Sequence, residues 1–190
     1  MRRFVDRGAI TAAWVGLGMA VTVVVSFVLV IPIGAPAVEI AALFGGMLIG
    51  YYANARSDRA GGPWTRIVPN ALLAGLVTGL TYAVLWLGVT AMFFNADSGY
   101  RDASSGGPLT CQTGADCVYQ RYLAIPGRRE AFEAAGITNV AQFTQLYWGE
   151  QFSTSGLMIG LSLAGSLAGG VMFGLANRRK LEPAEATSAA

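Results

Sequence analysis

The chain has few of the residues on which soluble proteins and most enzyme sites depend. Among its 190 residues there is no histidine, only 13% are charged, and cysteine occurs twice. The absence of histidine excludes His-ligated haem, zinc sites that use histidine, and the Ser-His-Asp and Cys-His mechanisms. A net charge of +2 gives no indication that nucleic acid is a partner. We expect no cofactor and no metal site.

Apolar residues are abundant instead, and they are concentrated in long stretches. The hydrophobic set makes up 54% of the chain and the mean hydropathy is +0.49. Asp, Glu, Lys and Arg are absent from 67–96 and 151–177, and Glu39 is the only such residue in 8–55. A helix of about 20 apolar residues crosses a bilayer. The pattern predicts an all-α integral membrane four-helix bundle with the lipid bilayer as its surroundings.

Proline and charge positions set the expected boundaries. Pro32 and Pro36 divide the first stretch in two, because proline lacks the N–H that a helix interior needs. We expect spanning helices at 9–32, 36–55, 68–95 and 153–177, a loop at 96–152, and a disordered tail at 178–190.

The first helix has an alternative interpretation as a cleaved signal peptide. A basic segment precedes it, and Ala35-Pro36-Ala37 resembles a cleavage site. The apolar run 8–31 is longer than the roughly 7–15 residues of a signal peptide core. A retained helix is therefore favoured.

The positions of the basic residues predict the orientation of the chain in the membrane. Nine of the 13 lie in three short segments: Arg2, Arg3 and Arg7, then Arg56, Arg59 and Arg66, then Arg178, Arg179 and Lys180. Short loops rich in Lys and Arg stay in the cytoplasm. We therefore expect both termini in the cytoplasm, the cytoplasmic (inner) membrane as the location, and an extracytoplasmic loop at 96–152.

Two helix ends share a glycine pattern. The second helix ends Gly45-Gly46-Met47-Leu48-Ile49-Gly50 and the fourth ends Gly169-Gly170-Val171-Met172-Phe173-Gly174, and Asn and Arg follow both. One interpretation is a duplicated pair of parallel helical hairpins. The other is that both ends meet the same packing requirement.

Small residues four positions apart predict close helix contacts. The pairs are Gly46 and Gly50, Gly75 and Gly79, Gly156 and Gly160, and the series Ser162, Ser166, Gly170 and Gly174. Such faces suit a tight bundle, a homo-oligomer or a larger membrane-protein complex.

Few polar residues lie within the predicted spans. Glu39 lies about one turn into the second helix, where the positive end of the helix dipole favours a carboxylate at the membrane interface. A proton or cation site is the alternative. The hydroxyl residues Thr22, Ser26, Thr78, Thr81 and Tyr82 form a polar seam or hydrogen-bond to their own helix or to a neighbouring one.

The long loop carries both cysteines and two helix signals. Cys111 and Cys117 predict a disulfide if the loop lies outside the cytoplasm. Redox chemistry, as in four-helix thiol oxidases, would require Cys-x-x-Cys and a second pair. One helix is expected at 128–135 with Gly136 ending it. A second begins after Thr138 or Asn139, with Val140, Phe143, Leu146 and Tyr147 on one face.

Residues 40–80 carry a family resemblance. The second helix ends in the pattern Gly-Gly-x-x-x-Gly-Tyr, a glycine-rich basic loop follows, and the third helix has Ala74-Gly75. The residues concerned are Gly45, Gly46, Gly50, Tyr51, Gly61 and Gly62. This region resembles uncharacterised small four-helix prokaryotic membrane proteins. The resemblance implies a four-helix fold and no particular site.

The sequence is compatible with three functions. The favoured one is a non-catalytic accessory or structural subunit, or an assembly partner, of a membrane complex. The alternative is a small oligomeric transporter or channel. An enzyme would need loop carboxylates such as Glu130, Glu133 and Glu150 to converge, which the sequence does not indicate.

Overall fold

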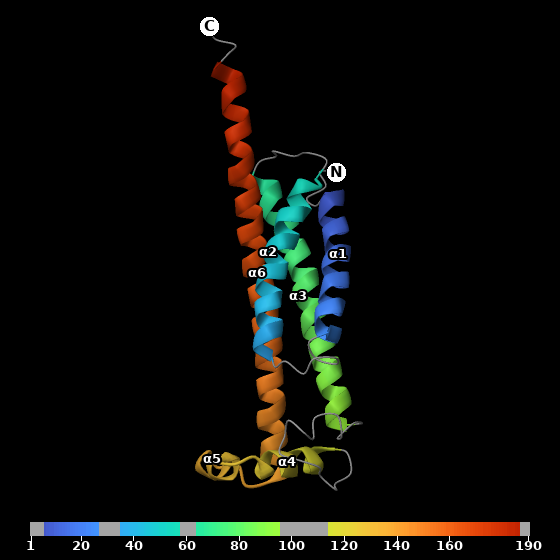
Figure 1. Cartoon of the computed structure of the whole chain (residues 1–190), viewed down its shortest axis with the longest axis vertical. Helices are drawn as coiled ribbons and strands as arrows, with labels where there is room; N and C mark the ends of the chain where they lie inside the picture. The colour runs from blue at the N-terminus through green and yellow to red at the C-terminus, as the bar shows by residue number, and fades with distance from the viewer. Residues whose placement is uncertain (1–5, 27–34, 58–63, 96–113, 187–190) are drawn as a thin grey trace. The chain divides into compact units, whose positions relative to one another are not determined.

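A computed structural model describes residues 6–26, 35–57, 64–95 and 114–186, with side chains in the last range described as far as Ala176. Every regular element in these ranges is helical (Figure 1). The helices are α1 (Arg7–Val24), α2 (Ala35–Ala55), α3 (Trp64–Asn95), α4 (Ala115–Ala124), α5 (Arg128–Ala134) and α6 (Val140–Ala186). The predicted all-α class is confirmed for the described residues.

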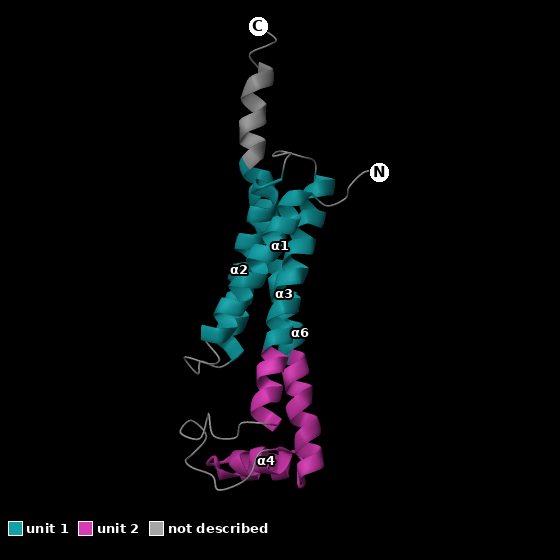
Figure 2. Cartoon of the chain, turned by 90° about the vertical axis from the view of Figure 1, so that its right-hand side faces the viewer, with its two compact units in different colours: residues 1–85, 154–190 teal, residues 86–153 magenta. Residues whose placement is uncertain are grey.

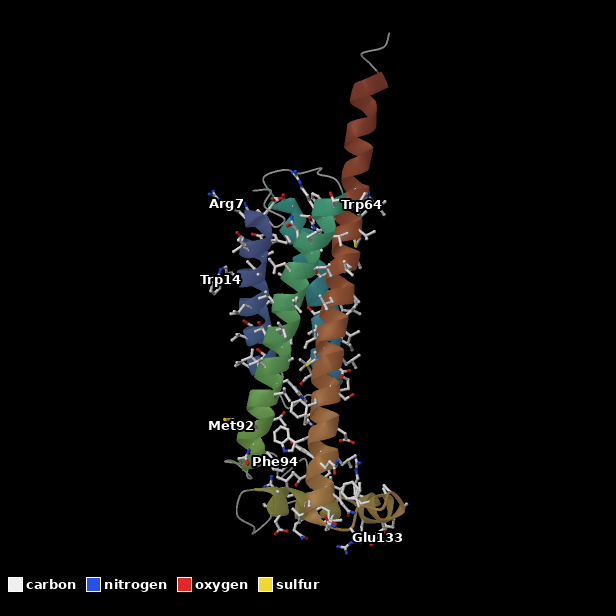
Figure 3. The ribbon with its side chains drawn as sticks, turned by 180° about the vertical axis from the view of Figure 1, so that it is seen from behind. Arg7, Trp14, Trp64, Met92, Phe94 and Glu133 are labelled. Carbon is white, nitrogen blue, oxygen red and sulfur yellow. The ribbon has the colours of Figure 1, made fainter. Side chains whose placement is uncertain are left out.

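Four of these helices are long and apolar enough to cross a membrane: Arg7–Val24, Ala35–Ala55, Trp64–Asn95 and Val140–Ala176. Large apolar side chains cover their outer faces, with Trp14 70%, Leu48 63% and Val84 66% exposed. The side chain of Trp14 points away from the neighbouring helices (Figure 3). Water disfavours so much exposed apolar surface, whereas lipid does not. These helices indicate a multi-pass membrane protein.

The chain divides into two compact units, residues 1–85 with 154–190 and residues 86–153 (Figure 2). We call them the bundle unit and the aromatic unit. The bundle unit contains α1, α2, α3 up to residue 85 and α6 from residue 154.

Small side chains form much of the core of the bundle unit. Seven alanines are 0% exposed: Ala9, Ala12, Ala20, Ala42, Ala53, Ala71 and Ala74. Lipid is as apolar as a protein core, so helices in a membrane associate through close van der Waals packing. Short side chains allow that packing because they let helix backbones approach each other.

Aromatic rings form the core of the aromatic unit. Phe94, Tyr119, Phe132, Ile137 and Phe143 are buried together. The Phe94 and Tyr147 ring centroids lie 5.0 Å apart, and those of Tyr119 and Phe143 lie 5.2 Å apart. These rings join the end of α3 to α4, α5 and the start of α6.

The junction between α5 and α6 follows the sequence signals. Gly136 has φ 74°, its N–H bonds to the Glu133 carbonyl, and the Ile137 N–H bonds to the Phe132 carbonyl. This is the glycine-ended helix terminus that the sequence predicts. Asn139 Oδ1 then accepts a hydrogen bond from the Gln142 N–H at 2.9 Å, so Asn139 rather than Thr138 caps α6.

Several helix boundaries in the structure differ from the predicted ones. The first helix was expected at 9–32, but α1 runs from Arg7 to Val24, and residues 27–34 lie outside the described part of the chain. The third helix begins at Trp64 rather than residue 68, with Pro69 inside it. A proline this near the helix start removes a single backbone hydrogen bond, so the helix tolerates it.

The fourth spanning helix is longer than predicted. Instead of a surface helix, a separate span at 153–177 and a disordered tail, α6 continues over 47 residues from Val140 to Ala186. No proline interrupts 140–176, and Arg, Lys, Leu, Glu and Ala near its end favour helix. Helix α4 was not predicted either; it begins at Ala115 within the expected cysteine loop.

Candidate functional site

Two of the predicted small residues bring α2 against α6 in the bundle unit. A Cβ built on Gly46 would lie 2.9 Å from Ser162 Cα, and one on Gly50 would lie 2.6 Å from Ser166 Cα. Real Cβ atoms essentially never come within 3.0 Å of another heavy atom in this way. From the first contact to the second, the residue number rises by four in both helices, so α2 and α6 run parallel. Only glycine permits this approach of the two backbones.

The same two serines join α6 to α3. Ser162 Oγ donates a hydrogen bond to the Gly75 carbonyl at 3.0 Å, and Ser166 Oγ donates to the Ala71 carbonyl at 2.6 Å. A Cβ on Gly75 would lie 2.5 Å from Ser166 Cβ. On Gly79 it would lie 3.1 Å from Ser162 Cβ. We call this meeting of α2, α3 and α6 the serine–glycine junction.

The remaining predicted glycines divide into two groups. A Cβ on Gly170 would lie 3.0 Å from Ala71 Cβ, and one on Gly174 would lie 2.8 Å from the Trp64 ring, so both glycines pack on α3. A Cβ on Gly156 or Gly160 would meet nothing within 4 Å. These two glycines make no close contact within the described residues, because they lie on the exposed face of α6, and their contact with another chain stays a prediction.

Sequence reasoning missed other close-contact glycines. A Cβ on Gly165 would lie 3.0 Å from the Met47 nitrogen, and one on Gly169 would lie 2.8 Å from the Tyr51 nitrogen. These two glycines are also four residues apart, which is the spacing that could have identified them. Gly16 of α1 similarly faces the Thr78 side chain.

The two matching glycine patterns do not occupy equivalent places. Gly46 and Gly50 of α2 face α6, which would belong to the other hairpin. Gly170 and Gly174 of α6 instead face α3, the preceding spanning helix, which would belong to the same hairpin as α6. In a duplicated hairpin, matching residues would face matching helices. The contacts therefore favour the interpretation that both helix ends meet a packing requirement.

Polar groups join three segments at one end of the bundle unit. The Asp6 N–H donates to Asn70 Oδ1 at 3.1 Å, and Ser57 Oγ donates to Asp6 Oδ2 at 2.6 Å. Asn54, 2% exposed, donates to the Ile67 carbonyl at 3.3 Å. The start of α1, the end of α2 and the start of α3, which carry two of the predicted basic segments, therefore meet (Figure 1).

The threonines of the expected polar seam bond to their own helices. Thr22 donates to the Gly18 carbonyl at 2.9 Å, Thr78 to Ala74 at 2.8 Å and Thr81 to Val77 at 2.8 Å. Glu39 is partly exposed and lies in the second turn of α2. Its place at the membrane interface stays a prediction.

The cysteines lie partly outside the described residues. Cys117 is 2% exposed in the first turn of α4, and no cysteine among the described residues is a free thiol. Cys111 lies outside the described part of the chain. Its pairing with Cys117 stays a prediction.

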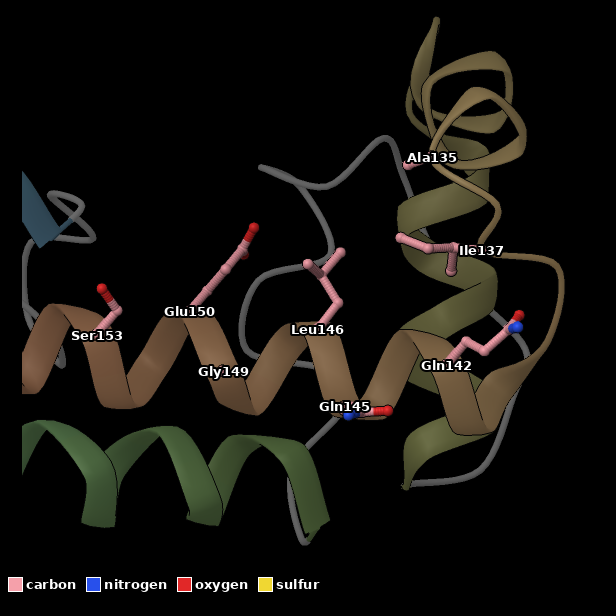
Figure 4. A pocket seen from close by; sticks show the side chains of 8 residues that line it. All are labelled: Ala135, Ile137, Gln142, Gln145, Leu146, Gly149, Glu150 and Ser153. Atoms are coloured by element: carbon pink, nitrogen blue, oxygen red, sulfur yellow. The ribbon is translucent and has the colours of Figure 1, made fainter.

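A shallow groove of about 590 Å³ lies in the aromatic unit (Figure 4). It is lined by Ala135, Ile137, Gln142, Gln145, Leu146, Gly149, Glu150 and Ser153. Leu146, Glu150 and Ser153 point away from α3. Of the loop carboxylates considered for catalysis, Glu150 alone lines this groove, while Glu130 and Glu133 are exposed on α5.

In the part of the chain that the structure describes, His, Cys, Asp and Glu form no group of three suited to a metal ion. Comparison with protein-family models, with curated proteins and with solved structures finds no match to this chain. The serine–glycine junction, where α2, α3 and α6 meet through backbone contacts and serine hydrogen bonds, is the candidate site. Its chemistry is that of helix association: backbone contact and neutral hydrogen bonds.

Proposed function

We propose that this chain is a non-catalytic multi-pass protein of the cytoplasmic membrane that acts as an accessory or structural subunit, or an assembly partner, of a membrane complex. The serine–glycine junction is the observation that carries the proposal. A Cβ at Gly46 or Gly50 would overlap α6, so the backbones there already touch. A bundle closed in this way is suited to act as a rigid support.

Transport would require polar groups directed toward a route through the bundle. Ser162 and Ser166 instead donate to the carbonyls of Gly75 and Ala71. The threonines donate within their own helices. These hydrogen bonds stabilise the helices and occupy the protons of these serine and threonine hydroxyls, which supports the subunit role over the transporter role.

The exposed face of α6 supports a contact with another chain. Gly156, Gly160, Ala164 and Ala168 are exposed at four-residue spacing, while Ser162, Ser166, Gly170 and Gly174 are buried inside the bundle unit. A helix of a partner protein can approach closely along small residues. In our proposal, this face of α6 lies against a transmembrane helix of the larger complex.

Native purification in mild detergent tests the proposal. The particle mass and the identity of the co-purifying chains would be measured for the wild type, Gly160→Leu and Gly18→Leu. Gly18 is the matched control, because a Cβ there also meets nothing within 4 Å but the residue lies on α1. We expect a stoichiometric larger partner with the wild type and Gly18→Leu, and its loss with Gly160→Leu.

A particle that contains only this chain, as a defined oligomer, would contradict the subunit proposal and favour the small transporter or channel. Flux would then be compared between the wild type and Glu39→Gln. A partner that survives Gly160→Leu would retain the subunit role but remove this face of α6 from it.

A further inference from the structure

Two exposed arginines lie where the start of α1 meets the end of α2 in the bundle unit. A Cβ built on Gly8 would lie 2.6 Å from the backbone carbon of Arg56 and 2.6 Å from the Ser57 nitrogen, so the two backbones touch there. Arg7 directly precedes this contact and Arg56 is part of it, and both side chains are exposed. Two long cationic side chains therefore start from adjoining backbone segments.

An aromatic ring positions the guanidinium of Arg56. Its Nε donates a hydrogen bond to Tyr52 Oη at 3.3 Å, and its Cζ lies 5.7 Å from the centre of the Tyr52 ring. Tyr52 packs in turn against a cluster that includes Ala9 and Ala12 of α1. The ring thus orients the cation at the α1–α2 contact. The terminal nitrogens of Arg56 have no acceptor among the described residues, so their protons are available to a ligand.

The positive charge at this end exceeds the negative charge. Over 1–8 and 54–67, the sequence contains six arginines and two aspartates. One of these, Asp6, accepts a hydrogen bond from Ser57 through Oδ2 at 2.6 Å. No described carboxylate forms a salt bridge with Arg7 or Arg56. This surplus of positive charge attracts an anion.

Exposed apolar side chains continue from both arginines along the same helix sides. Ile10 and Trp14 follow Arg7 by three and seven residues, so they share its side of α1, and they are 52% and 70% exposed. Figure 3 shows Arg7 at the end of α1 and Trp14 farther along it. Leu48 precedes Arg56 by eight residues on α2 and is 63% exposed. A ligand with an anionic head and apolar chains matches this surface, whereas a free phosphate matches the arginines alone.

We propose that Arg7 and Arg56 bind the phosphate of an anionic phospholipid, whose acyl chains lie along the exposed apolar sides of α1 and α2. Guanidinium groups donate paired, charge-assisted hydrogen bonds to phosphate oxygens. Basic residues at the ends of spanning helices lie at the level of the lipid headgroups, where anionic lipids are recognised. The site involves neither the serine–glycine junction nor the exposed face of α6, so it stands apart from the subunit proposal.

Native mass spectrometry of the purified full-length protein in detergent tests this site. The protein would receive equal amounts of phosphatidylglycerol and phosphatidylcholine with identical acyl chains, and the ratio of the two bound lipids would be measured. We expect the wild type to prefer phosphatidylglycerol. Arg7→Gln and Arg56→Gln should each reduce this preference roughly five-fold, and the double variant should reduce it further.

The matched control is a variant with Arg128→Gln and Arg129→Gln, which removes two exposed arginines of α5 and should retain the preference. An equal loss in this control would overturn the proposal, because it indicates a general attraction of charge. Equal binding of both lipids by the wild type, or a preference that survives the double variant at Arg7 and Arg56, would overturn it as well.

Inorganic phosphate separates a lipid site from a site for a free anion. An excess of inorganic phosphate should leave phosphatidylglycerol bound to the wild type, because the free anion lacks the acyl chains that contact Ile10, Trp14 and Leu48 in the proposed site. Displacement of the lipid by inorganic phosphate would overturn the lipid assignment.

Discussion

Gly50 and Gly156 are the same residue type in two membrane helices, and their surroundings differ. A Cβ at Gly50 would lie 2.6 Å from Ser166 Cα, whereas one at Gly156 would meet nothing within 4 Å. The atom that blocks Gly50 belongs to the backbone of α6, so it cannot rotate away as a flexible side chain could. The effect of adding a methyl group should therefore depend on the facing helix rather than on helix propensity.

We expect Gly50→Ala to destabilise the protein by about 1–3 kcal/mol, because α2 and α6 must separate to admit the methyl group. Gly156→Ala should leave stability unchanged or raise it by up to about 1 kcal/mol, since alanine is the better helix former. Thermal unfolding of both variants in the same detergent measures the difference. Equal effects would contradict the backbone contact at the serine–glycine junction.

Hydroxyl residues also differ by what faces them. Ser162 and Ser166 donate across to α3, while Thr78 and Thr81 donate to their own helix. Nothing in the residue type distinguishes these cases. Glycines of α3 opposite the serines let them reach a neighbouring backbone.

Among the helices, the junction of α5 and α6 is the one that local sequence specifies most fully. Gly136 takes a positive φ that other residues adopt at a cost, and Asn139 caps α6 through its side chain. Both signals act within a few residues, so they can be recognised without knowledge of the tertiary structure. The continuation of α6 through the expected break at residue 153 could not be recognised in the same way.

Asn139→Ala should destabilise the aromatic unit by about 1 kcal/mol, because the Gln142 N–H loses its acceptor. Asn139→Ser should retain most of the stability, since serine caps helices nearly as well. Near-ultraviolet circular dichroism during heating would report the loss, because this unit has an aromatic core. A loss as large for serine as for alanine would contradict the capping role.

For the whole molecule, the polar contacts of Asp6 with Ser57 and Asn70 gather the ends of three helices in the bundle unit. This agrees with the prediction that the basic segments near these ends lie on one side of a membrane. The positive-inside rule names that side as the cytoplasm. The orientation itself stays a prediction that labelling can test.

We expect Asp58→Cys to react in intact cells only with a thiol reagent that crosses the membrane, because its loop is predicted to be cytoplasmic. Glu133→Cys, at an exposed position of α5, should react with an impermeant reagent. Labelling is measured by mass shift, with the wild type as the background for Cys111 and Cys117. The reverse pattern would invert the assigned topology.

Composition and charge spacing are sufficient to predict a helical membrane protein, because apolar length and the cost of unpaired backbone groups in lipid act without tertiary detail. Gly136 as a helix end and most of the junction glycines are also predictable, because these signals lie within a few residues along the sequence. The residue that contacts each glycine is not predictable. Gly46 and Gly160 both belong to glycine pairs with four-residue spacing, yet Gly46 meets a helix backbone and Gly160 is exposed. Four-residue spacing marks a face of a helix, but only the packing of α2, α3 and α6 selects which face is covered.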